Sequence, residues 1–193
     1  MAGTARYTAL LDACVLFPVA VCDALMSIAA TGVYAPKWSR RIDEEWVRNL
    51  EREKGMPPGT FTTRCECMHN ACPDWEVPEE AWKVLEPCLQ LPDSKDRHVL
   101  AAAIAGHADC LVTFNLKDFP VTVLDPLGIE VLHPDSFVIA QLDLDTLRVL
   151  PAFKKMRARL KNPAFTPAAF ADAIERNGLP QTARVLRDAA ELI

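Results

Sequence analysis

The sequence predicts an α/β fold with a central parallel sheet, helices on both of its faces, and a small all-helical extension. Three observations support this prediction. Short apolar stretches alternate with longer amphipathic ones up to residue 133. These short stretches are mostly apolar, as expected for parallel strands buried on both sides. After Pro134 the sequence shows no convincing strand. We therefore expect one domain over 7–133 and a helical extension over 134–193.

The strands and helices are expected in alternation along the first part of the chain. Strands are expected at 7–12, 33–36, 110–114 and 128–133, with a further possible short strand at 88–91. A helix should end near Gly32, and another should begin after the N-cap residue Ser39 and stop at Gly55. Further helices are expected at 60–72, 77–85 and 96–106. In the extension, Thr166 followed by a proline marks a helix start, and Gly178 follows a stop.

Composition and charge narrow the function classes. The chain has 193 residues, half of them hydrophobic, and a formal net charge of -5. A negative total argues against wrapping nucleic acid over the whole surface, but local patches matter more than totals. Residues 1–133 contain 12 Lys and Arg and 19 Asp and Glu. Residues 134–193 contain 9 Lys and Arg and 7 Asp and Glu, so the negative charge lies in the first part of the chain.

The cellular compartment is indicated by what the sequence lacks. No signal peptide is evident at the N-terminus, and the apolar runs are too short to span a bilayer. The seven cysteines are an odd number and follow no disulfide framework. We expect reduced thiols, a cytoplasmic location and no membrane.

Polar side chains follow two of the predicted strands. Asp12 ends the first strand, and Thr113, Asn115 and Asp118 follow the strand "CLVTF". Ligands of open α/β sheets bind outside the carboxyl ends of the strands. A helix cap at Asp12 and a polar turn after Thr113 are the structural alternatives.

Two predicted helices each carry an acid beside their apolar face. Glu45 borders the face formed by Ile42 and Trp46, whereas Glu44 faces solvent, because successive residues turn by about 100°. Asp96 shares the buried face of the next acidic helix, and Asp93 precedes it by three residues. Caps or partners of the helix dipole are the alternatives for these two aspartates.

Several carboxylates brought to one edge of a sheet repel one another and need a cation. Oxygen ligands suit Mg²⁺ or Mn²⁺. Such ions activate water and bind phosphoryl oxygens, so the pattern points to metal-assisted phosphodiester hydrolysis.

Three segments carry a family resemblance. "LLDACVLFP", "WSRRIDEEW" and "LPDSKDRHVLAAAIAGHADCLVTFNLKDFP" are similar to the acidic motifs of PIN-domain nucleases, over about residues 7–133. The helical extension resembles one carried by some VapC-like proteins. The first motif departs from the family pattern at Ala13 and Cys14, where Thr and Asn are common. This departure removes two hydrogen-bonding side chains near the metal.

The resemblance implies an endoribonuclease, the toxin of a toxin–antitoxin pair. Its implied metal ligands and catalytic acids are Asp12, Glu45, Asp96 and Asp118. Asp93 is an additional ligand, Thr113 and Asn115 have supporting roles, and Asn115 competes with Asp118 for the fourth ligand position. The implied cofactor is Mg²⁺ or Mn²⁺. The implied partners are RNA, a small antitoxin protein and a second copy of the chain.

RNA also needs positive charge beside the acidic pocket. Candidates occur near Glu45, beside Asp96, and in the run "KKMRARLK" of the extension. A solvated helix face is the alternative for each group. The candidates are Arg40, Arg41, Arg97, Lys154, Lys155 and Arg157.

Three other functions stay open at this stage. A catalytically weak PIN module would bind RNA or a protein without cutting, and the departure at Ala13 and Cys14 motivates it. A DNA nuclease of the same fold differs only in substrate. A phosphoacceptor domain also gathers acids at strand ends, but it needs its aspartate on a central strand, whereas Asp96 is expected on a helix.

Overall fold

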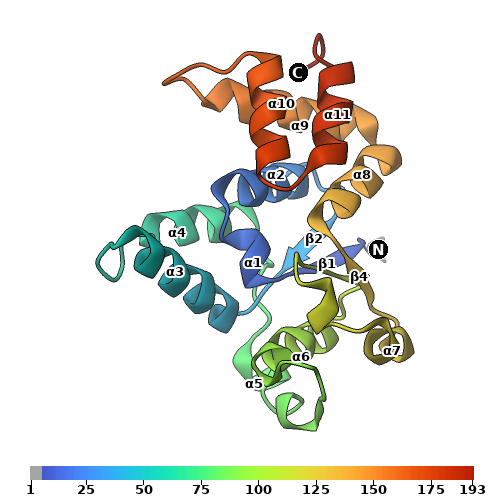
Figure 1. Cartoon of the computed structure of the whole chain (residues 1–193). Helices are drawn as coiled ribbons and strands as arrows, with labels where there is room; N and C mark the ends of the chain where they lie inside the picture. Colours follow the sequence, from blue (N-terminus) through green and yellow to red (C-terminus); the bar gives the residue numbers. More distant parts are fainter. Residues whose placement is uncertain (1–5) are drawn as a thin grey trace.

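A computed structural model of the chain describes residues 6–193. Its centre is a parallel sheet in the order β2-β1-β3-β4. In register, Leu11 of β1 lies opposite Val112 of β3. The predicted α/β fold is confirmed (Figure 1). The strands are β1 (Thr8–Leu11), β2 (Ala35–Lys37), β3 (Cys110–Val112) and β4 (Glu130–Leu132).

Helices connect and cover the strands. Among residues 6–193, no helix combines the length and the apolar character that crossing a bilayer requires. Short 3₁₀ turns η1 (Glu86–Cys88), η2 (Ser94–Asp96), η3 (Leu116–Asp118) and η4 (Asp125–Leu127) lie between the α-helices. The α-helices are α1 (Ala13–Leu16), α2 (Val19–Ala29), α3 (Arg40–Lys54), α4 (Thr62–Ala71), α5 (Glu79–Trp82), α6 (Arg97–Ala105), α7 (Val121–Leu124), α8 (Pro134–Leu144), α9 (Thr146–Arg159), α10 (Pro167–Arg176) and α11 (Pro180–Asp188).

Helix α3 has the ends that its sequence predicts. Ser39 is the N-cap, and its hydroxyl accepts a hydrogen bond from the Ile42 N–H at 3.3 Å. Gly55 ends the helix in the left-handed region, with φ of 62°, where glycine has no steric penalty. These two signals set where α3 begins and ends.

The possible strand at 88–91 is wrong. Residues Glu86–Cys88 form η1, and the residues after it carry no regular structure. Pro87 lies within η1, and Pro92 follows the apolar stretch. Prolines disfavour a sheet strand because they lack the N–H that a strand ladder uses.

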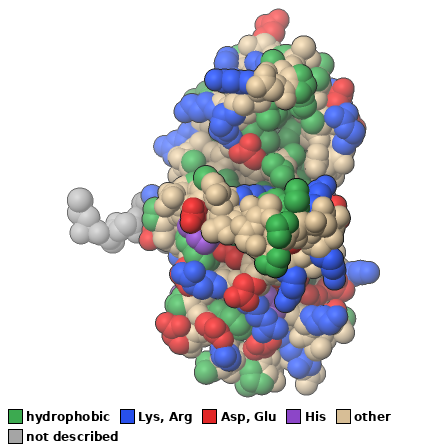
Figure 2. All heavy atoms as spheres, turned by 90° about the vertical axis from the view of Figure 1, so that its left-hand side faces the viewer, with side chains coloured by type: hydrophobic (Ala, Val, Ile, Leu, Met, Phe, Trp, Pro, Cys, Tyr) green, Lys and Arg blue, Asp and Glu red, His purple; other side chains and the backbone are tan. Residues whose placement is uncertain are grey.

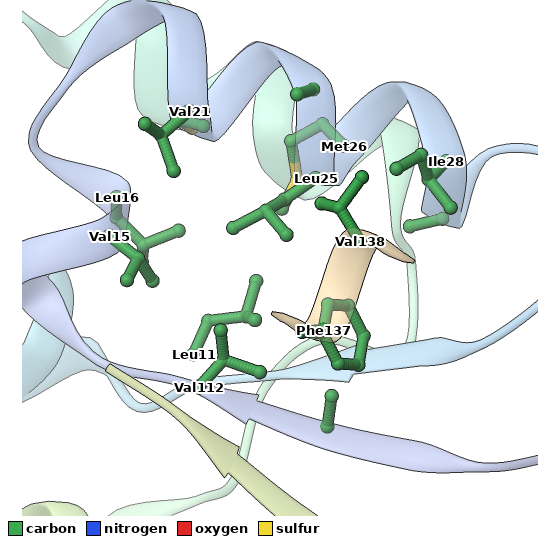
Figure 3. Packing of buried hydrophobic residues seen from close by; sticks show 14 of the residues in the cluster. Leu11, Val15, Leu16, Val21, Leu25, Met26, Ile28, Val112, Phe137 and Val138 are labelled. Atoms are coloured by element: carbon green, nitrogen blue, oxygen red, sulfur yellow. The ribbon is translucent and has the colours of Figure 1, made fainter. Parts of the chain in front are cut away.

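One apolar core runs from the sheet through α2 into the extension. Leu25 of α2 points toward Leu11 and Val112 of the sheet, and Phe137 and Val138 of α8 lie on the same cluster (Figure 3). All five side chains are fully buried. The helices after Pro134 therefore share their core with the sheet.

Polar contacts also hold the extension in place. The Asp135 carboxylate, 2% exposed, accepts hydrogen bonds from the Gln181 and Thr182 N–H groups at 2.8 and 2.9 Å. The Thr182 hydroxyl donates a third at 2.8 Å. Arg159 at the end of α9 bonds to Asp23 of α2 at 2.5 Å. These contacts join α8 to the start of α11, and α9 to α2.

The turn between α10 and α11 lies against the end of β3. Gly178 has a φ of 87°, and a Cβ placed there would lie 3.0 Å from the ring of Phe114. Phe114 follows Thr113 directly. The extension thus reaches the edge of the sheet at which the acids are expected.

Candidate active site

Asp12 and Thr113 meet at the carboxyl ends of β1 and β3. The Thr113 hydroxyl donates to Asp12 Oδ2 at 2.7 Å, and both side chains are buried. Asp12 precedes α1 but makes no side-chain cap bond. Burial raises the pKa of the Asp12 carboxyl, the two hydrogen bonds from Cys14 and Thr113 lower it, and the charge of Glu45 raises it. The parallel pairing of β1 with β3 places these side chains together.

Cys14 supplies one of the two hydrogen-bonding groups whose loss the departure from the family motif predicts. Its thiol donates to Asp12 Oδ2 at 3.1 Å and lies 3.3 Å from the Thr113 hydroxyl. The Cys14 sulfur also accepts the Phe114 N–H at 3.2 Å. Burial, followed by the charge of Asp12, raises the pKa of this thiol, so it stays protonated as a donor. Only the contribution of Ala13 is therefore missing.

Asp96 lies among other acids at the start of α6. It makes no side-chain cap bond. Its pKa is raised from 3.8 to about 6, first by burial and then by the charges of Asp12, Asp93, Asp118 and Glu45. The mutual repulsion shows that these acids share one region of negative potential.

Asp93 has a structural task that Asp96 lacks. Its carboxylate accepts the Lys95 N–H at 2.9 Å and caps η2. The cap alternative thus holds for Asp93. Asp118 ends η3, and Asn115 precedes that turn, with its N–H donating to the Thr113 hydroxyl at 3.0 Å.

Glu45 projects from α3 beside a buried histidine. Glu45 is partly exposed, whereas Glu44 is exposed, as the helix pattern predicted. His98 of α6 is 3% exposed, and its Nε2 lies 3.3 Å from Glu45 Oε2. The Nδ1 atom of His98 is buried without a hydrogen-bond partner among residues 6–193. This leaves Nε2 as the polar atom of His98 that meets a partner, and that partner is Glu45.

The chemistry of these donors suits a hard divalent cation. The acids supply only oxygen ligands, and no ion pair to Asp12, Asp96 or Asp118 is formed within the part of the chain that the structure describes. In the same residues, no three His, Cys, Asp or Glu side chains stand close enough to hold a metal ion together. The acids thus affect one another electrostatically, but their side chains are not yet positioned to coordinate one metal ion together.

The raised pKa of Asp96 makes the stability of the metal-free protein depend on pH. The folded protein keeps the Asp96 proton up to about pH 6, whereas the unfolded chain loses it near 3.8. The folded state binds more protons in this window, so the free energy of unfolding falls as pH rises through it. Because Asp96 is partly exposed, screening limits the effect to about 1 kcal/mol. We expect Asp96→Asn to raise the metal-free midpoint of thermal unfolding near pH 7.

The comparison is made by thermal unfolding in a chelator, near pH 7 and near pH 4. The advantage of Asp96→Asn should shrink at the lower pH, because wild-type Asp96 is then protonated and neutral as well. A variant that unfolds at the same temperature as the wild type near pH 7 would contradict the electrostatic origin of the shift.

Two of the predicted substrate-binding arginines on α3 are already engaged. Arg40 pairs with Glu76 at 2.7 Å and lies over the ring of Trp75. Arg41 pairs with Glu86 at 2.8 Å, yet it lines a hollow that also contains Glu45. Arg97, at the start of α6, has a buried Nε without a partner among the described residues.

The basic run of α9 is divided in the structure. Arg157 donates to the backbone carbonyls of Phe165 and Ile193, so it closes the extension on itself. Lys154 and Lys155 are exposed. Lys155 lines a separate hollow with residues of α2 and α9, including Arg148 and Arg159. None of the described hollows that contain Glu45 is lined by a residue of α9.

Residues other than the predicted acids also contribute to this region. Cys14 bonds to Asp12, and His98 lies beside Glu45. Arg48 and Lys95 line the hollow beside Glu45. The signal for Arg48 was its spacing from Glu45 on one helix face, but Lys95 required knowledge of how α6 packs.

A parallel sheet with acids beside its strand ends defines an α/β protein with an acidic centre. The chain belongs to the PIN domain family, which matches residues 8–117, more than half of the sequence. Residues 134–188 match a second family, the VapC50 C-terminal domain. The Mycobacterium tuberculosis (strain ATCC 25618 / H37Rv) protein named "Putative ribonuclease VapC50" is 43% identical over 93 residues, 48% of this chain and 54% of that protein. The match thus spans about half the length of that relative. No solved structure matches the chain.

Proposed function

We propose that this chain is a metal-dependent endoribonuclease of the VapC type, acting as the toxin of a toxin–antitoxin pair. The observation that carries the proposal is that the charges of four other acids act on Asp96 and raise its pKa, while Asp96 forms no ion pair among the described residues. The family and the name of the relative support the same activity. Membership of the PIN family also argues against the phosphoacceptor alternative.

In this proposal, Mg²⁺ or Mn²⁺ is held by Asp12, Glu45, Asp96 and Asp118, with Asp93 assisting. When bound, the ion would activate a water molecule and neutralise charge on the phosphoryl oxygens. Because the carboxylates are not gathered into a closed set, their side chains must approach one another when the ion binds.

The surrounding residues orient these acids. Thr113 and Cys14 hold Asp12 Oδ2 with neutral donors, and these two hydrogen bonds lower the pKa of the Asp12 carboxyl against the larger raising effect of its burial. His98 positions Glu45 from α6. Asn115 lines the hollow next to Glu45 and Cys14, where its neutral amide can meet substrate or complete the ligand set in place of Asp118.

Removal of the metal tests the proposal directly. We expect the purified chain to cut total cellular RNA into discrete fragments with Mg²⁺ or Mn²⁺, and to lose this activity in excess EDTA because the carboxylates then repel phosphate. Electrophoresis of the fragments is the measurement, and re-addition of the ion should restore cutting. Fragments that persist in EDTA would contradict the metal requirement.

The same experiment separates the remaining alternatives. A DNA substrate in a parallel reaction tests the DNA nuclease of the same fold. Tight RNA binding with no cleavage under any metal condition would favour a binding module, which the missing polar side chain at Ala13 motivates. The hydrogen bond from Cys14 to Asp12 favours the active enzyme.

The VapC-type assignment carries three further proposals. The first is a small antitoxin protein that binds this chain and blocks the acidic centre. Its gene is expected beside this one, and co-purification tests the complex.

The second proposal is a division into a nuclease domain over 7–133 and a helical extension over 134–193. The third is that the chain forms a homodimer. Light scattering of the purified chain checks the dimer.

A further inference from the structure

A hollow of about 580 Å³ runs beside α3 and contains Glu45 in its lining. Arg41, Glu45, Arg48 and Arg52 lie on one face of α3, because their spacing of four, three and four residues follows the helix repeat. Lys95 and His98 line the hollow from the other side. The hollow therefore combines one proposed catalytic acid and one exposed acid, Glu44, with four basic side chains.

The basic side chains of this hollow differ in how they are engaged. Arg41 pairs with Glu86 and lies over the ring of Trp82. Arg48 and the Lys95 ammonium form no ion pair within residues 6–193. Arg52 donates only to the neutral Asn49 Oδ1, at 3.2 Å. Among the described residues, three cations of this hollow thus form no ion pair, although Glu44 and Glu45 also line it.

Figure 2 shows this side of the molecule. Basic side chains are interspersed with acidic ones over its lower half, at the height of α3, α5 and α6 in Figure 1. A mixed surface of this kind cannot attract a polyanion over its whole area. A local row of cations is needed to bring phosphates next to the carboxylates.

The hollow continues past Glu45. A second hollow of about 550 Å³ shares Glu45, Asn49 and Arg52 with the first, and extends to Phe17 and Asn115. Glu45 therefore lies where the two hollows meet. From Arg41 to Arg52 the helix rises by about 16 Å, which accommodates a few nucleotides of an extended strand.

We propose that Arg48, Arg52 and Lys95 hold the backbone phosphates of single-stranded RNA, and that the strand crosses α3 at Glu45 toward Phe17. The inference deepens the proposed nuclease function and rests on it. Single-stranded RNA is favoured because the partly buried Phe17 ring offers a surface on which an unpaired base can stack. Arg52 and Glu45 line both hollows, so the phosphate next to the cut bond lies beside Arg52.

The test measures RNA binding separately from cleavage. Fluorescence anisotropy with a labelled single-stranded oligoribonucleotide is performed in the Asp96→Asn background, over a series of salt concentrations. Arg48→Gln, Arg52→Gln and Lys95→Gln are compared with Arg184→Gln, which removes an exposed charge from α11. Removing one cation that binds a phosphate of a single strand should lower the slope of log affinity against log salt by about 0.7. We expect a slope lower by about 1.4 in Arg48→Gln/Arg52→Gln, for two such cations, and an unchanged slope in Arg184→Gln.

Cleavage kinetics give the second readout. With Asp96 intact, Arg48→Gln and Lys95→Gln should raise KM about tenfold and change kcat less than about twofold, because phosphate contacts act on binding. Slopes and KM values equal to those of the wild type would overturn the proposal that Arg48, Arg52 and Lys95 bind backbone phosphates. Equal reductions in affinity for a duplex RNA probe would overturn the single-strand assignment. If the wild type does not cleave RNA but the salt slopes change as expected, the nuclease function is refuted. The proposed phosphate binding by the three cations is then still supported.

Discussion

Asp96→Asn is expected to lower the rate of metal-dependent RNA cleavage by at least about 100-fold. Loss of one preorganised charged group in a site of this kind typically costs about two to three orders of magnitude in rate. Asp96 is the acid whose pKa responds to all the other carboxylates, so its charge is the one most closely coupled to them. The substitution keeps the size of the side chain and removes only the charge.

The measurement is single-turnover cleavage of RNA by wild type and variant at saturating Mg²⁺. Asp143→Asn is the matched control, because Asp143 is an exposed aspartate of α8 outside the proposed metal site. We expect the activity of the control to fall by less than about tenfold. Equal rates for Asp96→Asn and wild type would remove Asp96 from the metal site. Equal fragment patterns from both would indicate a contaminating nuclease.

Asp135→Ala is expected to lower the free energy of unfolding by about 3 kcal/mol. Asp135 is buried and accepts three hydrogen bonds from the start of α11. Hydrogen bonds to a charged group contribute about 1.5–3 kcal/mol each, and their loss leaves buried N–H groups without an acceptor. The negative charge also lies at the N-terminus of α11, where it complements the helix dipole.

Urea unfolding, followed by circular dichroism, measures this effect. Asp143→Ala on the same helix is the control, because Asp143 is exposed and the expected change is below about 0.5 kcal/mol. A second variant, Thr182→Val, removes one of the three donors and should cost about 1 kcal/mol. If Asp135→Ala unfolds at the same urea concentration as the control, the carboxylate does not anchor α11.

Much of the fold could be predicted because its signals are local. Ser39 and Gly55 mark the ends of α3 through cap and turn chemistry, and the position of Glu45 beside Trp46 follows from the helix repeat. The apolar strands predicted the parallel sheet in the same way. The possible strand at 88–91 failed because apolar character alone does not distinguish a strand from a short turn bounded by prolines.

The contacts within the site could not be predicted with the same ease. The bond from Cys14 to Asp12 depends on the register of β1 against β3, which brings Thr113 to the same point. The approach of His98 to Glu45 depends on how α6 packs against α3. Sequence motifs therefore predicted the acids, and tertiary packing determines which neighbours contact them.

The close contact between Gly178 and Phe114 limits which amino-acid substitutions the extension can accept during evolution. A side chain at this position would meet the Phe114 ring at 3.0 Å, one residue from Thr113. A substitution at Gly178 would therefore displace Phe114, whose N–H donates to Cys14 beside Asp12, so residues of the extension and of the sheet edge must vary together. Consider a hybrid that joins residues 1–133 of this chain to the extension of a distant homologue. If a larger residue replaced Gly178 in that extension, it would clash with Phe114 even though every acid of the site is retained.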